Sequence, residues 1–243
     1  VSSLICSHDL TGVTTSDLYI KDTSGNGYDI AKLGGGDHTF KAGEMYQAAK
    51  PIAETPNAFE AWVKLPSGYT GRPGIILGTY GTASKPMINF ELTSKAVPRF
   101  YWMNAKGDLA DIQFSDVKST DICTGSWVHI AITRDVANGK VHCYINGALK
   151  QSKDLGSTGA IDITPVEPFG FGADYRITGD IQNFKGNIKS AAVYSTCLTA
   201  EQIAANYKAS KPTGDATNSF ICYYDLTKVP VGGNYANDYS GNG

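Results

Sequence analysis

The sequence lacks the features that mark membrane-spanning and nucleic-acid-binding proteins. It contains no apolar run of roughly 18 residues, the length that a membrane-crossing helix needs, so we expect no membrane insertion. Its formal net charge is only −2 at pH 7. Binding to a phosphate backbone needs a concentrated basic surface, and no basic cluster stands out in the chain. We therefore expect no nucleic-acid partner.

Paired cysteines are also missing. The cysteines are scattered and form no C-x-x-C pair, which argues against a structural zinc site. Their odd number argues against a complete set of intrachain disulfides, so we expect buried free thiols, which behave as small apolar side chains. The cysteines are Cys6, Cys123, Cys143, Cys197 and Cys222.

A sequence repeat divides the chain. Residues 4–11 match residues 220–227, and residues 19–27 match residues 235–243. The offset is the same in both places, since 220 − 4 and 235 − 19 both equal 216. A constant offset across a loop favours a tandem array of units over one protein whose closing strand happens to resemble its first.

The repeat predicts the domain organisation. We expect a domain at 1–211, a linker at 212–218, and the start of the next unit at 219–243. The third segment is expected to dock as one or more added strands on a free sheet edge, either of this domain or of a neighbouring chain. The second arrangement would be an intermolecular strand exchange.

Strand patterns dominate the sequence. Asn138-Gly139, flanked by alternating apolar runs, predicts a hairpin between 127–133 and 140–145. One short helix is expected at 198–207, where Thr199 and Gln202 have capping-box spacing. Many short strands with one late helix predict an all-β fold, a two-sheet antiparallel β-sandwich or jelly roll. Further strands are expected at 58–63, 74–78, 87–92, 99–103, 168–172 and 187–194.

The order of these motifs resembles the laminin-G-like branch of the concanavalin-A-like jelly-roll superfamily. The resemblance is carried by Phe-Glu-Ala-Trp-Val at 59–63, Trp-Val-His-Ile-Ala at 127–131, Tyr-Ile-Asn-Gly at 144–147 and the segment 184–203. It covers nearly all of residues 4–208 and implies the fold. The superfamily includes lectins, adhesion domains and hydrolases, so the resemblance leaves the function open.

No catalytic motif supports a hydrolase. The glycoside hydrolases of this fold carry Glu-x-Asp-x-x-Glu on one strand, which places an acid and a nucleophile on one face. No glutamate here has an aspartate two residues on, and no H-E-x-x-H, G-x-S-x-G or P-loop motif is present. We therefore expect that the protein is not an enzyme.

A calcium site is one candidate binding feature. The turn Asp-Thr-Ser-Gly-Asn-Gly at 22–27 resembles a turn that often helps to hold Ca²⁺ in laminin-G-like modules. Asp22 and Asn26 would supply hard oxygen ligands. The alternative is an Asx turn, in which Asp22 accepts hydrogen bonds from backbone amides. Lys189-Ser190, where relatives often have Asp-Glu, removes carboxylates from the expected shell.

Aromatic and charged residues are the other candidate ligand-binding features. In the strand at 99–103, Arg99 and Tyr101 share one face and Trp102 lies on the other, and one of these faces should reach solvent. An exposed ring beside charged groups stacks on sugar rings, although a core position for Trp102 is equally open. Trp62 and Trp127 are expected in the core. The remaining candidates lie in loops: Tyr69, Tyr80, Asp174, Tyr175 and Arg176.

These features favour a secreted or cell-surface recognition module that binds glycans, cut from a tandem-repeat protein. The alternatives are an adhesion domain that binds a host or cell-surface protein, and a structural spacer. Ca²⁺ is the one expected cofactor.

Overall fold

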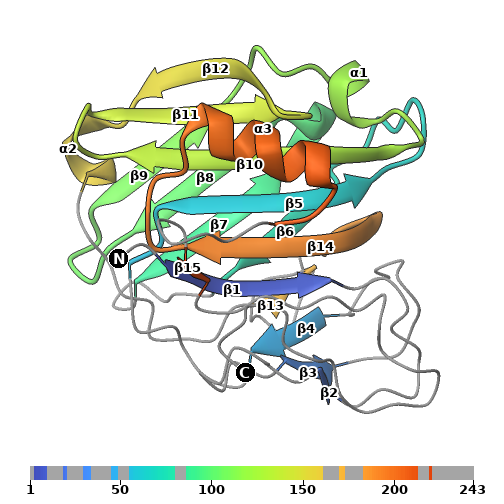
Figure 1. Cartoon of the computed structure of the whole chain (residues 1–243), viewed down its shortest axis with the longest axis horizontal. Coiled ribbons are helices and arrows are strands. Elements are labelled where there is room, and N and C mark those ends of the chain that lie inside the picture. Colours follow the sequence, from blue (N-terminus) through green and yellow to red (C-terminus); the bar gives the residue numbers. More distant parts are fainter. Residues whose placement is uncertain are drawn as a thin grey trace.

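The computed structural model describes residues 55–79, 86–160, 170, 172 and 183–212. It also describes the backbone of residues 3–9, 19–20, 30–33, 45–48, 171 and 219–220. Two antiparallel sheets stack face to face, and a short helix lies across one of them (Figure 1). The predicted all-β sandwich is confirmed.

The first sheet has seven strands, in the order β12-β11-β10-β5-β14-β1-β15. Its centre is antiparallel: β10 pairs with β5, and β5 pairs with β14. The predicted hairpin is also present, with Ile130 opposite Ile145. The strands are β1 (Ser3–Asp9), β5 (Ala58–Lys64), β10 (Trp127–Asp135), β11 (Lys140–Ile145), β12 (Ala148–Asp154), β14 (Asn187–Tyr194) and β15 (Ser219–Phe220).

The second sheet has eight strands, in the order β2-β3-β4-β13-β6-β7-β8-β9. Its last four strands form a regular antiparallel meander that ends the sheet at β9, apart from a shift in the register between β6 and β7. The strands are β2 (Tyr19–Ile20), β3 (Ile30–Leu33), β4 (Met45–Ala48), β6 (Gly74–Gly78), β7 (Met87–Leu92), β8 (Pro98–Met103), β9 (Leu109–Gln113) and β13 (Gly170–Phe171).

The main core lies between the sheets and follows the period-two alternation of the strands. On β5, Phe59 points inward, and its ring packs against Phe90 of β7 and Phe100 of β8 with centroids 6.3 and 6.0 Å away. On β8, Phe100 and Trp102 are buried while their neighbours are partly exposed. In the part of both sheets whose side chains the structure describes, the inner faces thus form the core.

Helix α3 (Ala200–Ala209) covers the outer face of the seven-stranded sheet (Figure 1). Its capping box is formed as predicted: Thr199 accepts from the Gln202 amide and the Gln202 side chain accepts from the Thr199 amide. Ile203 is buried in a second apolar cluster with Ala131, Tyr194 and Leu198. This helix explains why β5 is buried on both of its faces, from Ala58 to Val63.

A buried polar cluster holds α3 to the sheet. The carboxylate of Glu60 on β5 accepts hydrogen bonds from the Tyr194 hydroxyl on β14 and from the Asn206 amide of α3. Nε2 of His129 on β10 lies 3.0 Å from the same carboxylate. All four side chains are fully buried. Because a buried carboxylate without partners costs several kcal/mol, these contacts fix the position of the helix.

The C-terminal segment contributes a strand at the edge of the seven-stranded sheet. β15 runs parallel to β1, with Ser219 opposite Ser3 and Phe220 opposite Leu4. Each pair is separated by 216 positions, the offset of the sequence repeat. Equivalent residues of the two copies therefore lie side by side. The division into tandem units stays a prediction.

Most predicted elements agree with the structure within two residues. The predicted strands did not include β2, β3, β4, β9 and β12. Three elements of about one turn were not predicted either: α1 (Ser119–Ile122), α2 (Gly156–Gly159) and the 3-10 helix η1 (Ser94–Ala96). Cys123 and Cys143 are buried free thiols as expected, and burial raises the pKa of both. Cys197 is exposed, which corrects that expectation. Within the described residues, no helix is long and apolar enough to span a bilayer.

The polar cluster gives the first testable prediction. Tyr194→Phe removes the hydroxyl that donates to Glu60 and should lower the free energy of unfolding by about 1–3 kcal/mol. Urea denaturation followed by circular dichroism measures this change. Tyr207→Phe, the same change at an exposed position of α3, should stay within about 0.5 kcal/mol of the wild type. Equal effects of both variants would contradict the proposed role of the cluster.

Candidate functional site

The outer face of β7, β8 and β9 is the candidate functional surface. In the described part of the chain, no helix lies over it, whereas α3 covers the opposite side of the sandwich (Figure 1). Strand pairing arranges its outward side chains in rows across the three strands. We call this surface the β7–β9 face. Its members are Met87, Asn89, Glu91, Arg99, Tyr101, Met103, Leu109, Asp111 and Gln113.

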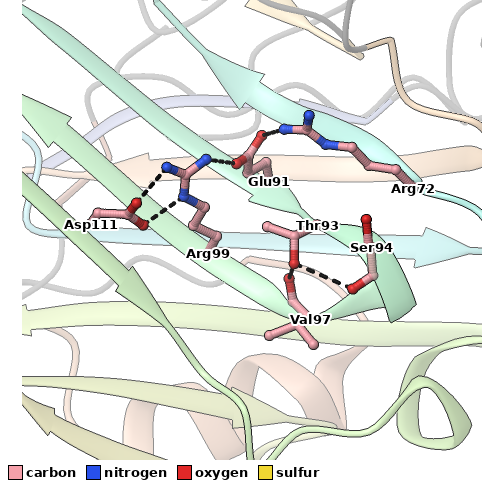
Figure 2. A network of polar contacts seen from close by, with 7 residues as sticks. All are labelled: Arg72, Glu91, Thr93, Ser94, Val97, Arg99 and Asp111. Atoms are coloured by element: carbon pink, nitrogen blue, oxygen red, sulfur yellow. Dashed lines mark hydrogen bonds and ion pairs between the residues drawn. The ribbon is translucent and has the colours of Figure 1, made fainter.

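Arg99 lies at the centre of a chain of ion pairs on this face (Figure 2). Its Nε and Nη2 each donate to an oxygen of Asp111 at 2.6 Å, and its Nη1 donates to Glu91 at 2.7 Å. The hydrogen bonds to Asp111, opposed by burial and assisted by Glu91, raise the pKa of Arg99. A two-pronged pair of this kind fixes the guanidinium plane on the sheet surface.

The chain of ion pairs continues to the loop before β6. Glu91, only 1% exposed, also accepts a hydrogen bond from Nη2 of Arg72 at 2.8 Å (Figure 2). The Tyr69 hydroxyl donates to the Arg72 carbonyl at 3.3 Å, and the Tyr69 ring packs on the core. Tyr69, which is itself partly exposed, therefore supports the loop that carries Arg72.

Tyr101 supplies the aromatic surface of the face. The Arg99 guanidinium carbon lies 4.6 Å from the centroid of its ring, a cation–π contact that restricts the ring. The ring remains partly exposed, and Asp111 is its direct neighbour on β9. The structure thus brings Arg99 and Tyr101 together as the strand pattern predicts, and it adds Asp111 and Glu91.

Trp102 is not part of this face, which corrects one predicted site residue. Its side chain is fully buried between the sheets, so it is not accessible to a ligand. The guanidinium carbon of Arg134 lies 4.2 Å from the centroid of its ring, and the Arg134 side chain donates to Asn57 and to the Gly159 carbonyl. This contact places a cation at the edge of the core, which a strand pattern does not reveal.

The other two tryptophans, both expected in the core, differ from each other. Trp62 is buried as expected, on the outer side of its sheet, with its ring centroid 4.2 Å from that of His129. Trp127 is 39% exposed, which corrects the expectation of a core position. It begins β10 opposite Lys64, which is also exposed. Because side chains alternate along β10, Trp127 lies on the same outward side as His129. This alternation is visible in the sequence and could have predicted the outward position of Trp127.

The remaining predicted site residues lie outside the described residues. They are Tyr80, Asp174, Tyr175 and Arg176 of the ligand-binding set, and Asp22 and Asn26 of the calcium set. In the part of the chain that the structure describes, no three His, Cys, Asp or Glu side chains form a group that could hold a metal ion. The calcium site therefore stays a prediction.

Comparison with known proteins identifies the architecture. A family model described as the concanavalin A-like lectin/glucanases superfamily, of the laminin G type, matches residues 33–204. No curated protein matches the chain.

Solved structures with the same fold include binding domains of larger proteins. Domain 4 of AbnA, an extracellular arabinanase from Geobacillus stearothermophilus solved with arabinotriose, superposes with a TM-score of 0.55 at 18% identity, over 84% of this chain and 98% of that domain. The receptor binding domain of botulinum neurotoxin D superposes with a TM-score of 0.58 at 17% identity, over 86% of this chain and 53% of that chain. The CBM40 domain of a Ruminococcus gnavus sialidase superposes with a TM-score of 0.50 at 17% identity, over 63% of this chain and 83% of that domain.

The placement of the tryptophans is testable by fluorescence quenching. Iodide reaches only exposed indole rings, so Trp127 should account for the quenchable part of the emission. We expect Trp127→Phe to abolish nearly all iodide quenching and Trp102→Phe to leave the quenchable part intact. Quenching that disappears with Trp102→Phe instead would show that Trp102 is exposed.

Proposed function

This chain belongs to the concanavalin A-like lectin/glucanases superfamily, and we propose that it is a non-catalytic module that binds glycans through the β7–β9 face. One observation carries the proposal: a partly exposed Tyr101 ring lies beside the exposed carboxylate of Asp111, and both are fixed by Arg99. Sugar rings present C–H groups that pack on aromatic faces and hydroxyls that bond to charged groups.

The rigidity of this group supports a binding role. Arg99 contacts Asp111, Glu91 and Tyr101 at once, so these side chains are already ordered before any ligand arrives. Ordering side chains on binding costs about 0.5–1.5 kcal/mol for each one, and a preformed surface avoids that cost. Two of the similar domains, that of the arabinanase and the CBM40, belong to proteins that act on carbohydrates.

Two groups that resemble catalytic pairs are better explained by structural roles. Glu60 and His129 form a carboxylate–imidazole pair, but both are fully buried beneath α3, where no substrate reaches them. On the β7–β9 face, both oxygens of Glu91 accept hydrogen bonds from arginines, so neither is free to attack a sugar. General acid or nucleophilic catalysis needs accessible groups.

Binding of a protein strand is the second candidate, because β12 is the last strand of its sheet and carries Leu149, which is 53% exposed. Lys150 and Lys153 lie on the same strand. Lysines on an edge strand discourage pairing with another chain. The glycan-binding proposal therefore ranks first.

The proposal also concerns where the protein acts and how its domains are arranged. We place the module outside the cell, in a secreted or surface protein built from tandem units. The repeat offset supports the arrangement, because β1 and β15 pair with equivalent residues side by side. Tandem units bind a multivalent glycan with higher avidity than one unit does.

The central test is Tyr101→Ala, assayed on a glycan array and then by calorimetry with the best oligosaccharide. Loss of the ring should weaken binding about tenfold or more, the effect of a residue worth over 1 kcal/mol. Trp127→Ala is the matched control, since it removes an exposed aromatic from the other sheet, and it should bind like the wild type. Selective loss with Trp127→Ala would move the site to that sheet.

The domain boundary can be tested by truncation. A chain that ends at Lys211 keeps the whole of α3, including its C-cap Ser210, and among the described strand pairs it loses only the two of β15. We expect it to unfold cooperatively and to bind the same oligosaccharide with affinity within about twofold, which is less than 0.5 kcal/mol. Failure of this variant to fold would contradict a domain boundary at this position.

A further inference from the structure

We infer that the ligand of the β7–β9 face is a neutral oligosaccharide, not a sialylated, uronic-acid or sulfated one. This inference rests on the proposed function and concerns the chemical class of its ligand. It follows from how the charges of the face are paired.

Among the residues that the structure describes, every charge of the face is matched by an opposite charge. The outward residues of β7, β8 and β9 include one cation, Arg99, and two carboxylates, Glu91 and Asp111. Arg72 adds the second positive charge from its loop. Two guanidinium groups and two carboxylates give a formal charge of zero. A site for an anionic sugar would instead present an excess of positive charge.

The guanidinium best placed to grip a carboxylate is already used. Each of the three nitrogens of Arg99 donates a hydrogen bond, two to Asp111 and one to Glu91. Nε and Nη2 form the edge of the guanidinium that can donate two parallel hydrogen bonds to one carboxylate, and this edge pairs with Asp111. A ligand carboxylate would have to displace Asp111 from this edge, so it would gain little and would lose an ion pair.

In the ion pair between Arg99 and Asp111, the negatively charged group is the more exposed one. The Asp111 side chain is 38% exposed and that of Arg99 only 20%. A ligand that approaches Tyr101 therefore meets a carboxylate, which repels anions and accepts hydrogen bonds from hydroxyls. Gln113, exposed on the same strand, carries an amide that both donates and accepts. These are partners for a sugar with hydroxyl groups and no charge.

The decisive experiment compares matched ligands on the intact chain. An array would carry neutral arabino-, xylo-, gluco- and galacto-oligosaccharides beside versions of the same cores that bear sialic acid, a uronic acid or sulfate. We expect binding to neutral members, at least tenfold weaker binding to their charged versions, and little change between 50 and 500 mM salt. Ion pairing with a ligand would be screened over that range.

A charge-removing variant tests the physical cause. Asp111→Ala releases the fork of Arg99 and leaves the face with one net positive charge. We expect it to gain at least fivefold in affinity for the sialylated or uronic version, and to lose affinity for the neutral one. Asp154→Ala removes an exposed aspartate whose partner is Lys140 on the other sheet, and it should change neither affinity.

The outcomes separate this inference from the proposed function. Preferential binding of charged glycans that Tyr101→Ala abolishes would overturn the neutral-ligand inference and leave the glycan-binding face intact. An array with no binding by the folded protein would overturn both. No gain for charged ligands in Asp111→Ala would show that pairing with Asp111 is not what excludes them, which also contradicts the inference.

Discussion

The arrangement of this molecule depends on the buried carboxylate of Glu60. It accepts hydrogen bonds from β14 and α3 and lies against His129 of β10, so a single carboxyl group joins β5 to three other elements. Burial makes each of these contacts costly to lose. The cluster holds α3 on the outer face of the seven-stranded sheet. As a result, one outer face of the sandwich packs against a helix, whereas no described helix covers the β7–β9 face.

Several side chains of the β7–β9 face hold one another in place, and some of these are still reached by solvent. Arg99 orders two carboxylates and one aromatic ring, while Asp111 and Tyr101 stay in contact with solvent. A surface of this kind loses little conformational entropy on binding. The same ion pairs that order the face leave its described residues with no excess of positive charge. Under the proposed function, the order of the face and its preference for neutral ligands would come from the same contacts.

The fold was predictable from the sequence because strand alternation and turn residues are local signals. The hairpin at Asn138-Gly139 and the capping box of Thr199 and Gln202 lie where the sequence places them. Arg99 and Tyr101 share the outward face of β8, as the alternation predicts. The partners of Arg99 were not predictable, because Glu91 and Asp111 meet it through strand pairing across 8 and 12 positions of sequence. Trp102 could not be assigned to a face because alternation gives two faces without saying which one is buried.

The most direct test of the account is a titration of isotopically labelled protein with a bound neutral oligosaccharide, followed by NMR. The account predicts that the amide signals of residues 98–103 and 109–113 shift and saturate together, while those of α3 and β12 do not move. Saturating shifts centred on Trp127, α3 or β12, with the β7–β9 face unchanged, would contradict it.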